Sequence, residues 1–95
     1  MSHLMTTLEM DGDNGRFVAS ADQKQLGYMD FTILANHVIN VYHTYVTPEA
    51  RGQGVAETLL EALAMYVKKN HYTVYAGCSY VASRLPLRYP EIALA

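Results

Sequence analysis

The sequence predicts an α+β fold, a sandwich of helices on a mostly antiparallel sheet, because the hydrophobic period changes along the chain. Before residue 48 apolar and polar residues alternate, which is the period-two pattern of half-buried strands. From residue 55 the period lengthens to about 3.6, as in an amphipathic helix. A short β-compatible run follows that helix at 73–77. Counted along the chain, the predicted order is β-β-β-α-β-α.

The first half of the chain predicts a meander of three strands at 17–20, 27–34 and 38–47, each rich in β-branched or aromatic residues. The first dozen residues are poorly patterned, and the dense turn signal at 11–15 separates a weak leading strand from the body. In the longest strand, alternation places five side chains on one face: Val38, Asn40, Tyr42, Thr44 and Val46.

The second half of the chain predicts its best helix at 54–70, with acidic residues near the start, basic residues in the last turn, and Asn70 as a left-handed stop. A strand lies on each side of this helix, so we expect a crossover that pairs those two strands in parallel. A second, shorter helix is predicted at 79–88, before Pro90 breaks the chain.

The composition predicts one globular domain over residues 1–95, since 51% of the residues are hydrophobic and 17% are charged. No apolar run approaches the roughly 20 residues of a membrane span, and no signal peptide is recognisable, so we expect a cytoplasmic protein. The net charge of −2 argues against nucleic acid as a partner. The single cysteine, Cys78, is expected as a thiol. The histidines show no metal-ligand spacing, so we predict no metal.

The loop before the long helix carries the strongest chemical signal. A helix N-terminus presents amides without intrahelical acceptors, and a loop without bulky side chains there receives a phosphate on its backbone. The alternative is a glycine-rich turn that only joins strand to helix. The loop is neither a Rossmann fingerprint nor a Walker loop, because the required glycines, lysine and hydroxyl residue are missing. Its six residues are Arg51, Gly52, Gln53, Gly54, Val55 and Ala56.

This loop resembles the acyl-CoA pyrophosphate loop of the GNAT superfamily, Q/R-x-x-G-x-G/A, at Arg51, Gly54 and Ala56. Residues 43–56, together with 78–81 and 89–91, resemble a minimal single-domain GNAT-like subgroup that has a cysteine after the helix. The resemblance implies a GNAT-like fold, acetyl-CoA as acyl donor and an amine as acceptor. It also implies that the six loop residues bind the pyrophosphate and that the backbone of Val46 contacts the pantetheine arm. Arg51 either contacts a phosphate or is solvated.

The resemblance implies that Cys78 lies near the thioester, where a thiol can accept the acyl group and pass it to an amine. The alternative for Cys78 is a small buried hydrophobe. His43 is either a general base or a packed strand histidine, and Tyr80 is a candidate proton donor to the departing thiolate. Asn40 and Thr44, expected on one face, are further candidates for polarising a carbonyl.

These residues leave three functions open. The first is an acetyl-CoA-dependent acetyltransferase that moves an acetyl group to an amine, either through a Cys78 acyl-enzyme or by direct attack. The others are a non-catalytic acyl-CoA-binding module and a small interaction domain. The expected partners are acyl-CoA and an unidentified amine, without nucleic acid or membrane. We expect a monomer or a weak dimer.

Overall fold

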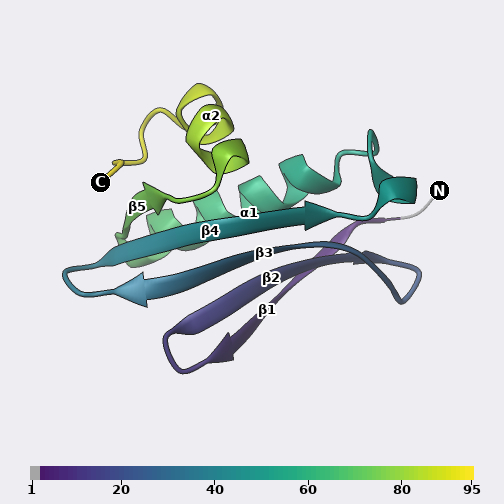
Figure 1. Ribbon diagram of the computed structural model, residues 1–95, viewed down its shortest axis with the longest axis horizontal. Helices are drawn as coiled ribbons and strands as arrows, with labels where there is room; N and C mark the ends of the chain where they lie inside the picture. The colour runs from purple at the N-terminus through teal and green to yellow at the C-terminus, as the bar shows by residue number, and fades with distance from the viewer. Residues whose placement is uncertain (1–2) are drawn as a thin grey trace.

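A computed structural model describes residues 3–95. Its five strands form one sheet in chain order, in which β1 to β4 are an antiparallel meander and β5 pairs in parallel with β4 (Figure 1). The fold class and the parallel crossover are therefore confirmed. The strands are β1 (Met5–Asp11), β2 (Asn14–Ala21), β3 (Lys24–Leu34), β4 (Val38–Val46) and β5 (Thr73–Ala76).

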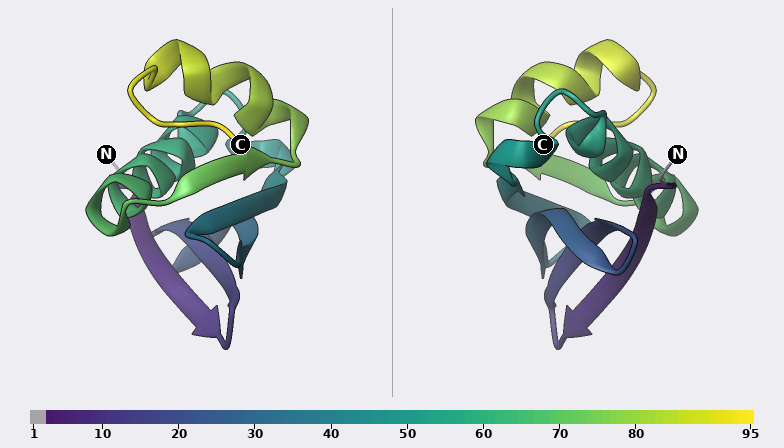
Figure 2. Two further views of the ribbon diagram at one scale, coloured as in Figure 1. Left: turned by 90° about the vertical axis from the view of Figure 1, so that its left-hand side faces the viewer. Right: turned by 90° about the vertical axis from the view of Figure 1, so that its right-hand side faces the viewer.

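Two α-helices and a short 3₁₀ helix complete the fold: η1 (Pro48–Ala50), α1 (Val55–Asn70) and α2 (Ser79–Arg88). Both end views show α1 against one face of the curved sheet and α2 above it beyond β5 (Figure 2). The other face of the sheet, which we call the outer face, has no helix over it in these views. No helix within residues 3–95 is long and apolar enough to cross a membrane.

Strand β1 adds one strand to the predicted order, which becomes β-β-β-β-α-β-α. All seven of its residues are exposed, so they show no alternation between buried and exposed side chains. Its continuous antiparallel register with β2, from Met5 opposite Ser20 to Asp11 opposite Asn14, defines it instead. Backbone pairing at a sheet edge leaves little trace in a hydrophobic pattern, which is why the segment reads as weakly patterned.

A β-bulge in β4 makes the predicted face of that strand wrong. Asp30 lies opposite His43 but Phe31 lies opposite Val41, so Tyr42 is an extra residue on β4. Beyond the bulge, the side chain of Thr44 lies opposite the fully buried Met29 on the α1 side. Asn40, before the bulge, lies opposite Thr32 on the outer face. Asn40 and Thr44 therefore lie on different faces.

The core lies between the sheet and α1, where the apolar side of the helix packs on β2, β3 and β4. Leu59, Leu63, Met29 and Phe31 are fully buried there. Helix α2 contributes Val81 and Leu85 to the same cluster, and Ile92 follows it. One continuous core thus fixes the start of α1 and the start of α2 relative to β4.

The helix boundaries follow the sequence pattern closely, with one correction at the end of α1. Asn70 is the last helical residue, and its Nδ2 donates to the carbonyl of Tyr66 at 2.9 Å. The left-handed residue is His71, with φ of 58°. The side chain of Asn70 bonds back one turn and stays in the helix, so the stop falls one residue later than expected.

Candidate functional site

The ends of β4 and β5 diverge and open a fork at the edge of the sheet. Strand β5 pairs with β4 only over residues 38–41, whereas β4 continues to Val46. Gly77 begins the departure of the chain from β4, since an added Cβ would lie 2.7 Å from Oδ1 of Asn40 and 3.3 Å from the carbonyl oxygen of Val41. The free edge of the second half of β4 therefore faces α2 across the fork.

The loop after β4 ends in two glycines with positive φ, 83° at Gly52 and 81° at Gly54, a conformation that other residues adopt only with strain. Gly54 is the N-cap of α1 without a side-chain capping bond. The turn hydrogen bonds of the loop use the amides of Ala50, Arg51 and Gln53. Within residues 3–95 the amides of Val55 and Ala56 have no backbone acceptor, so both are free to donate to a ligand at the start of the helix.

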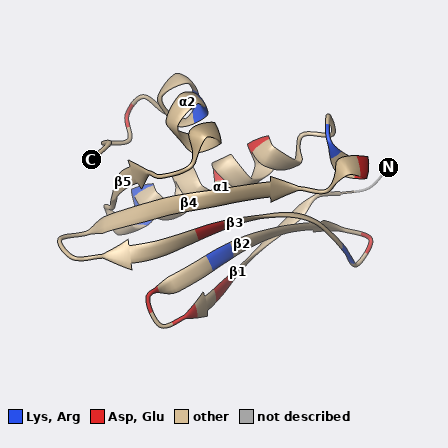
Figure 3. Cartoon of the chain, in the orientation of Figure 1, with Lys and Arg blue, Asp and Glu red and all other residues tan. Residues whose placement is uncertain are grey.

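A cavity of about 240 Å³ lies at this helix end. Six of the predicted cofactor-binding residues line it: Val46, Arg51, Gly52, Gly54, Val55 and Ala56. Gln53 instead donates from Nε2 to the carbonyl of Glu49 at 3.1 Å, so its side chain braces the loop. Figure 3 shows the Lys and Arg residues scattered over the chain, and Arg51 is the basic residue that lines this cavity, so an anion there would depend mainly on the backbone.

Ala50 and Glu57 also line this cavity, and sequence reasoning missed both. Glu57 is the third residue of α1, and its side chain turns back toward the loop, with Oε2 3.7 Å from the position of a Cβ at Gly54. An acidic residue in a first helical turn is ordinary, so the sequence alone gave no sign that it borders a cavity.

Cys78 lies two residues beyond β5 and is the N-cap residue of α2. It is partly buried, and its Sγ donates to Oγ1 of Thr44 at 3.4 Å, across the fork. Tyr80, in the first turn of the same helix, packs against the core. Burial raises the pKa of the Tyr80 phenol above its ordinary value, with Glu57 of α1 as the next cause. The fork thus brings together groups from β4, α1 and α2.

Three buried side-chain oxygens in residues 3–95 have no hydrogen-bond partner: Asn40 Oδ1, Thr47 Oγ1 and Tyr80 OH. Two come from β4 and its end, and the third comes from the first turn of α2. Buried polar groups in proteins are nearly always paired, so these three oxygens are candidates for hydrogen bonds to a ligand.

The family model for the GCN5-related N-acetyltransferases matches residues 16–94, which include the fork, the glycine loop and both helices. The chain belongs to this family, the GNAT family. No match was found among the curated proteins.

Solved GNAT structures share the fold of this chain. A GCN5-like putative N-acetyltransferase from Staphylococcus aureus is 26% identical to this chain, with a TM-score of 0.70. The match covers 94% of this chain and 88% of the Staphylococcus protein. A ribosomal-protein-alanine N-acetyltransferase from Brucella melitensis biovar Abortus 2308 is 24% identical with a TM-score of 0.67, over 90% of this chain. The aminoglycoside N-acetyltransferase AAC(6′)-Iy, solved with CoA, is 20% identical with a TM-score of 0.61, over 83% of this chain and 60% of its own. This GNAT chain spans only 62% of the length of the Brucella enzyme.

His43 of this GNAT chain is not brought together with Cys78. It is exposed on the outer face of β4, opposite Asp30, and its ring centroid lies 5.7 Å from that of Tyr28. Thr44, which contacts Cys78, lies on the other side of the same strand. A base at His43 would therefore serve a group that approaches from the outer face.

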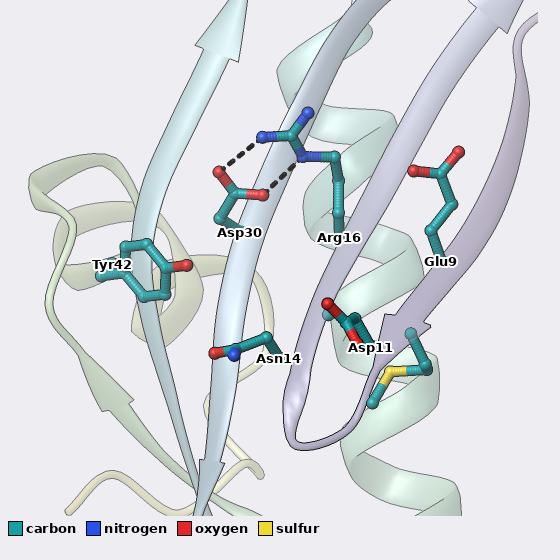
Figure 4. Close-up of a pocket in the computed structure, with 8 residues that line it drawn as sticks. Glu9, Asp11, Asn14, Arg16, Asp30 and Tyr42 are labelled. Atoms are coloured by element: carbon teal, nitrogen blue, oxygen red, sulfur yellow. Dashed lines mark hydrogen bonds and ion pairs between the residues drawn. The ribbon is translucent and has the colours of Figure 1, made fainter.

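A second cavity of this GNAT chain, about 340 Å³, opens on the outer face near the β1–β2 hairpin (Figure 4). The guanidinium of Arg16 donates to both carboxylate oxygens of Asp30, at 2.6 and 3.1 Å, and lies 3.9 Å from the ring of Tyr28. Hydrogen bonding to Asp30 raises the pKa of Arg16 above its ordinary value. Glu9 and Asp11 border the same cavity, so carboxylates outnumber cations around it.

Proposed function

We propose that this GNAT domain binds acetyl-CoA and transfers its acetyl group to an amine. The observation that carries the proposal is the continuity of two features: a glycine loop that presents the free amides of α1, and an open fork beside it that contains a thiol. Val46 lines the cavity at the start of α1, and Thr44, two residues earlier on β4, contacts the thiol of Cys78. This arrangement suits a long ligand with a phosphate at one end and a thioester at the other.

Binding of the CoA portion would rest on the backbone. The pyrophosphate would lie on the amides of Val55 and Ala56, where Gly52 and Gly54 leave room for close approach. The pantetheine arm carries amides, and the unpaired edge of β4 at Val46 offers it backbone partners. Arg51 is exposed beside the cavity and would add charge to the phosphate contacts.

One catalytic route passes through Cys78, which the resemblance to the minimal GNAT-like subgroup would place near the thioester. The Cys78 thiolate attacks the thioester carbonyl carbon, a bond forms from Sγ to the acetyl group, and the CoA sulfur departs with a proton from Tyr80. The amine then attacks the acetylated Cys78, the Sγ–acetyl bond breaks, and the proton of the amine passes to the Tyr80 phenolate. His43, on the opposite face of β4, does not lie beside this route. In the other route the amine attacks the thioester directly, and the thiol is not acetylated.

A second candidate function is a non-catalytic acyl-CoA-binding module. It is favoured by the separation of His43 from Cys78 on opposite faces of β4. In this function the fork and the loop bind the ligand and no amine is modified.

The first experiment measures thermal unfolding over a concentration series of acetyl-CoA. Binding to the folded state at about 100 times the dissociation constant would add roughly 2.7 kcal/mol to the free energy of unfolding. A melting temperature unchanged in millimolar acetyl-CoA would contradict CoA binding in either function.

The second experiment separates the two routes and the two functions. Intact-protein mass spectrometry after incubation with acetyl-CoA, beside Cys78→Ala, tests for one added acetyl group that depends on the thiol. Release of CoA with a panel of amines measures turnover of both proteins. If the Cys78→Ala protein transfers acetyl as fast as the parent, the covalent route is excluded and the amine attacks the thioester directly. If both proteins bind acetyl-CoA and neither turns over, the non-catalytic module is favoured.

A further inference from the structure

Thr44 interacts with the proposed reactive thiol from the opposite side of the fork. The Oγ1 of Thr44 lies 3.4 Å from Sγ of Cys78, and the two residues are 34 positions apart in the chain. This hydrogen bond joins β4 to the N-cap residue of α2. The contact therefore depends on the tertiary fold and on neither element alone.

The bulge at Tyr42 turns the hydroxyl of Thr44 into the fork. Without an extra residue at that point, Thr44 would keep the alternation of Asn40 and would lie on the outer face. With the bulge, it lies opposite Met29 on the α1 side, where Cys78 reaches it. A bulge that redirects a side chain beside a reactive group is a common use of this irregularity.

We propose that Thr44 is a positioning residue for Cys78, whose hydroxyl holds the sulfur in place and donates to it once the thiol has lost its proton. This inference rests on the proposed covalent route. In the resting protein the thiol donates to Oγ1. A hydroxyl rotates freely about its C–O bond, so after deprotonation Thr44 turns its own proton toward the thiolate. Hydrogen bonds to a charged group are the stronger kind, so the contact favours the thiolate over the thiol.

The neighbouring charged groups are the same whether or not Thr44 carries its hydroxyl. Tyr80 of α2 interacts electrostatically with Cys78 and also with three charged residues: Glu57, Arg84 and Arg88. His43 lies on the outer face of β4, away from the sulfur. A comparison of variants at position 44 therefore isolates the hydroxyl.

The test measures the rate at which iodoacetamide alkylates Cys78 between pH 6 and about 10.5, by intact-protein mass spectrometry without CoA. Thr44→Val keeps the β-branched shape and removes the hydroxyl, whereas Thr44→Ser keeps the hydroxyl and removes the methyl group. We expect the pH midpoint of alkylation to rise by about one unit in Thr44→Val and to stay near the parent value in Thr44→Ser. At neutral pH this corresponds to about tenfold slower alkylation.

Thermal melts of both variants establish that they are folded. A Thr44→Val midpoint that coincides with the parent's would overturn the proposal, and so would an equal shift in Thr44→Ser, because the hydroxyl would then not be the cause. The result is independent of the proposed function: a parent protein that acetyl-CoA never acetylates would exclude the covalent route, while the alkylation profiles would still decide the role of Thr44.

Discussion

Gly77 and Asn40 approach each other so closely that a side chain at position 77 would push the amide of Asn40 aside. A Cβ there would lie 2.7 Å from Oδ1 of Asn40, which is itself buried and unpaired. The two residues belong to the two sides of the fork, just where β5 stops pairing with β4. Their contact sets how closely the chain can return to β4 before it enters α2.

The first prediction concerns this contact. Gly77→Ala should lower the free energy of unfolding by about 1–3 kcal/mol, as overpacking usually does. Asn40→Ala removes the nearest atom, so the double variant should regain part of the loss, although the carbonyl of Val41 at 3.3 Å remains. A double-mutant cycle by urea unfolding measures the coupling. Additive effects of the two substitutions would show that the clash is relieved elsewhere.

The second prediction ranks two substitutions in the loop. Gly54→Val should weaken CoA binding more than Arg51→Ala, because a branched side chain at positive φ disturbs the backbone contacts while loss of an exposed charge removes one contact. Gly12→Val is the matched control, since Gly12 also has positive φ, with open space around it, at the distant β1–β2 turn. Titration calorimetry provides the affinities. A folded Gly54→Val protein that binds better than Arg51→Ala would refute the backbone cradle.

The third prediction concerns Glu57, whose carboxylate borders the cavity proposed to bind the pyrophosphate. Glu57→Gln should bind CoA about two- to fivefold more tightly, because it removes a partly screened negative charge next to the expected pyrophosphate. The gain should shrink as salt is raised. Glu61→Gln, one turn further along α1, is the control. Unchanged or weaker binding by Glu57→Gln at low salt would argue that no phosphate lies beside this residue.

The fourth prediction concerns stability at alkaline pH. Burial, followed by the neighbouring Tyr72, raises the pKa of Tyr66 above its ordinary value of about 10. Above about pH 10 the folded state keeps the Tyr66 proton, whereas the unfolded state loses it. The contribution of Tyr66 to the free energy of unfolding is therefore fully present below about pH 10 and is lost as the pH rises further. Tyr66→Phe should flatten this fall in denaturant melts between pH 9 and about 11. Tyr75→Phe, at an exposed tyrosine, is the control, and an equal flattening there would contradict the assignment.

Periodicity predicted the helices well because it is a local property. The 3.6-residue pattern placed the long helix at 54–70 against an observed Val55–Asn70, and the second helix at 79–88 as observed. The glycine loop was also predicted correctly as the start of a helix, because glycine at a helix start is itself a local signal. The binding and catalytic roles of the predicted site residues remain predictions, although the fold gathers most of the loop residues around one cavity.

By itself, then, the sequence determined the α+β class, the helices, the crossover and the loop from which family membership could be inferred. Only the tertiary structure decided that β1 joins the sheet, that a bulge at Tyr42 sends Asn40 and Thr44 to opposite faces, and that Glu57 borders the cavity at the start of α1. The physical reason is the range of the interactions. Helical period and turn chemistry depend on neighbours a few residues away, whereas strand register depends on pairing between distant segments and on how one core packs. The contact of Cys78 with Thr44 is of this second kind, and no pattern within either segment contains it.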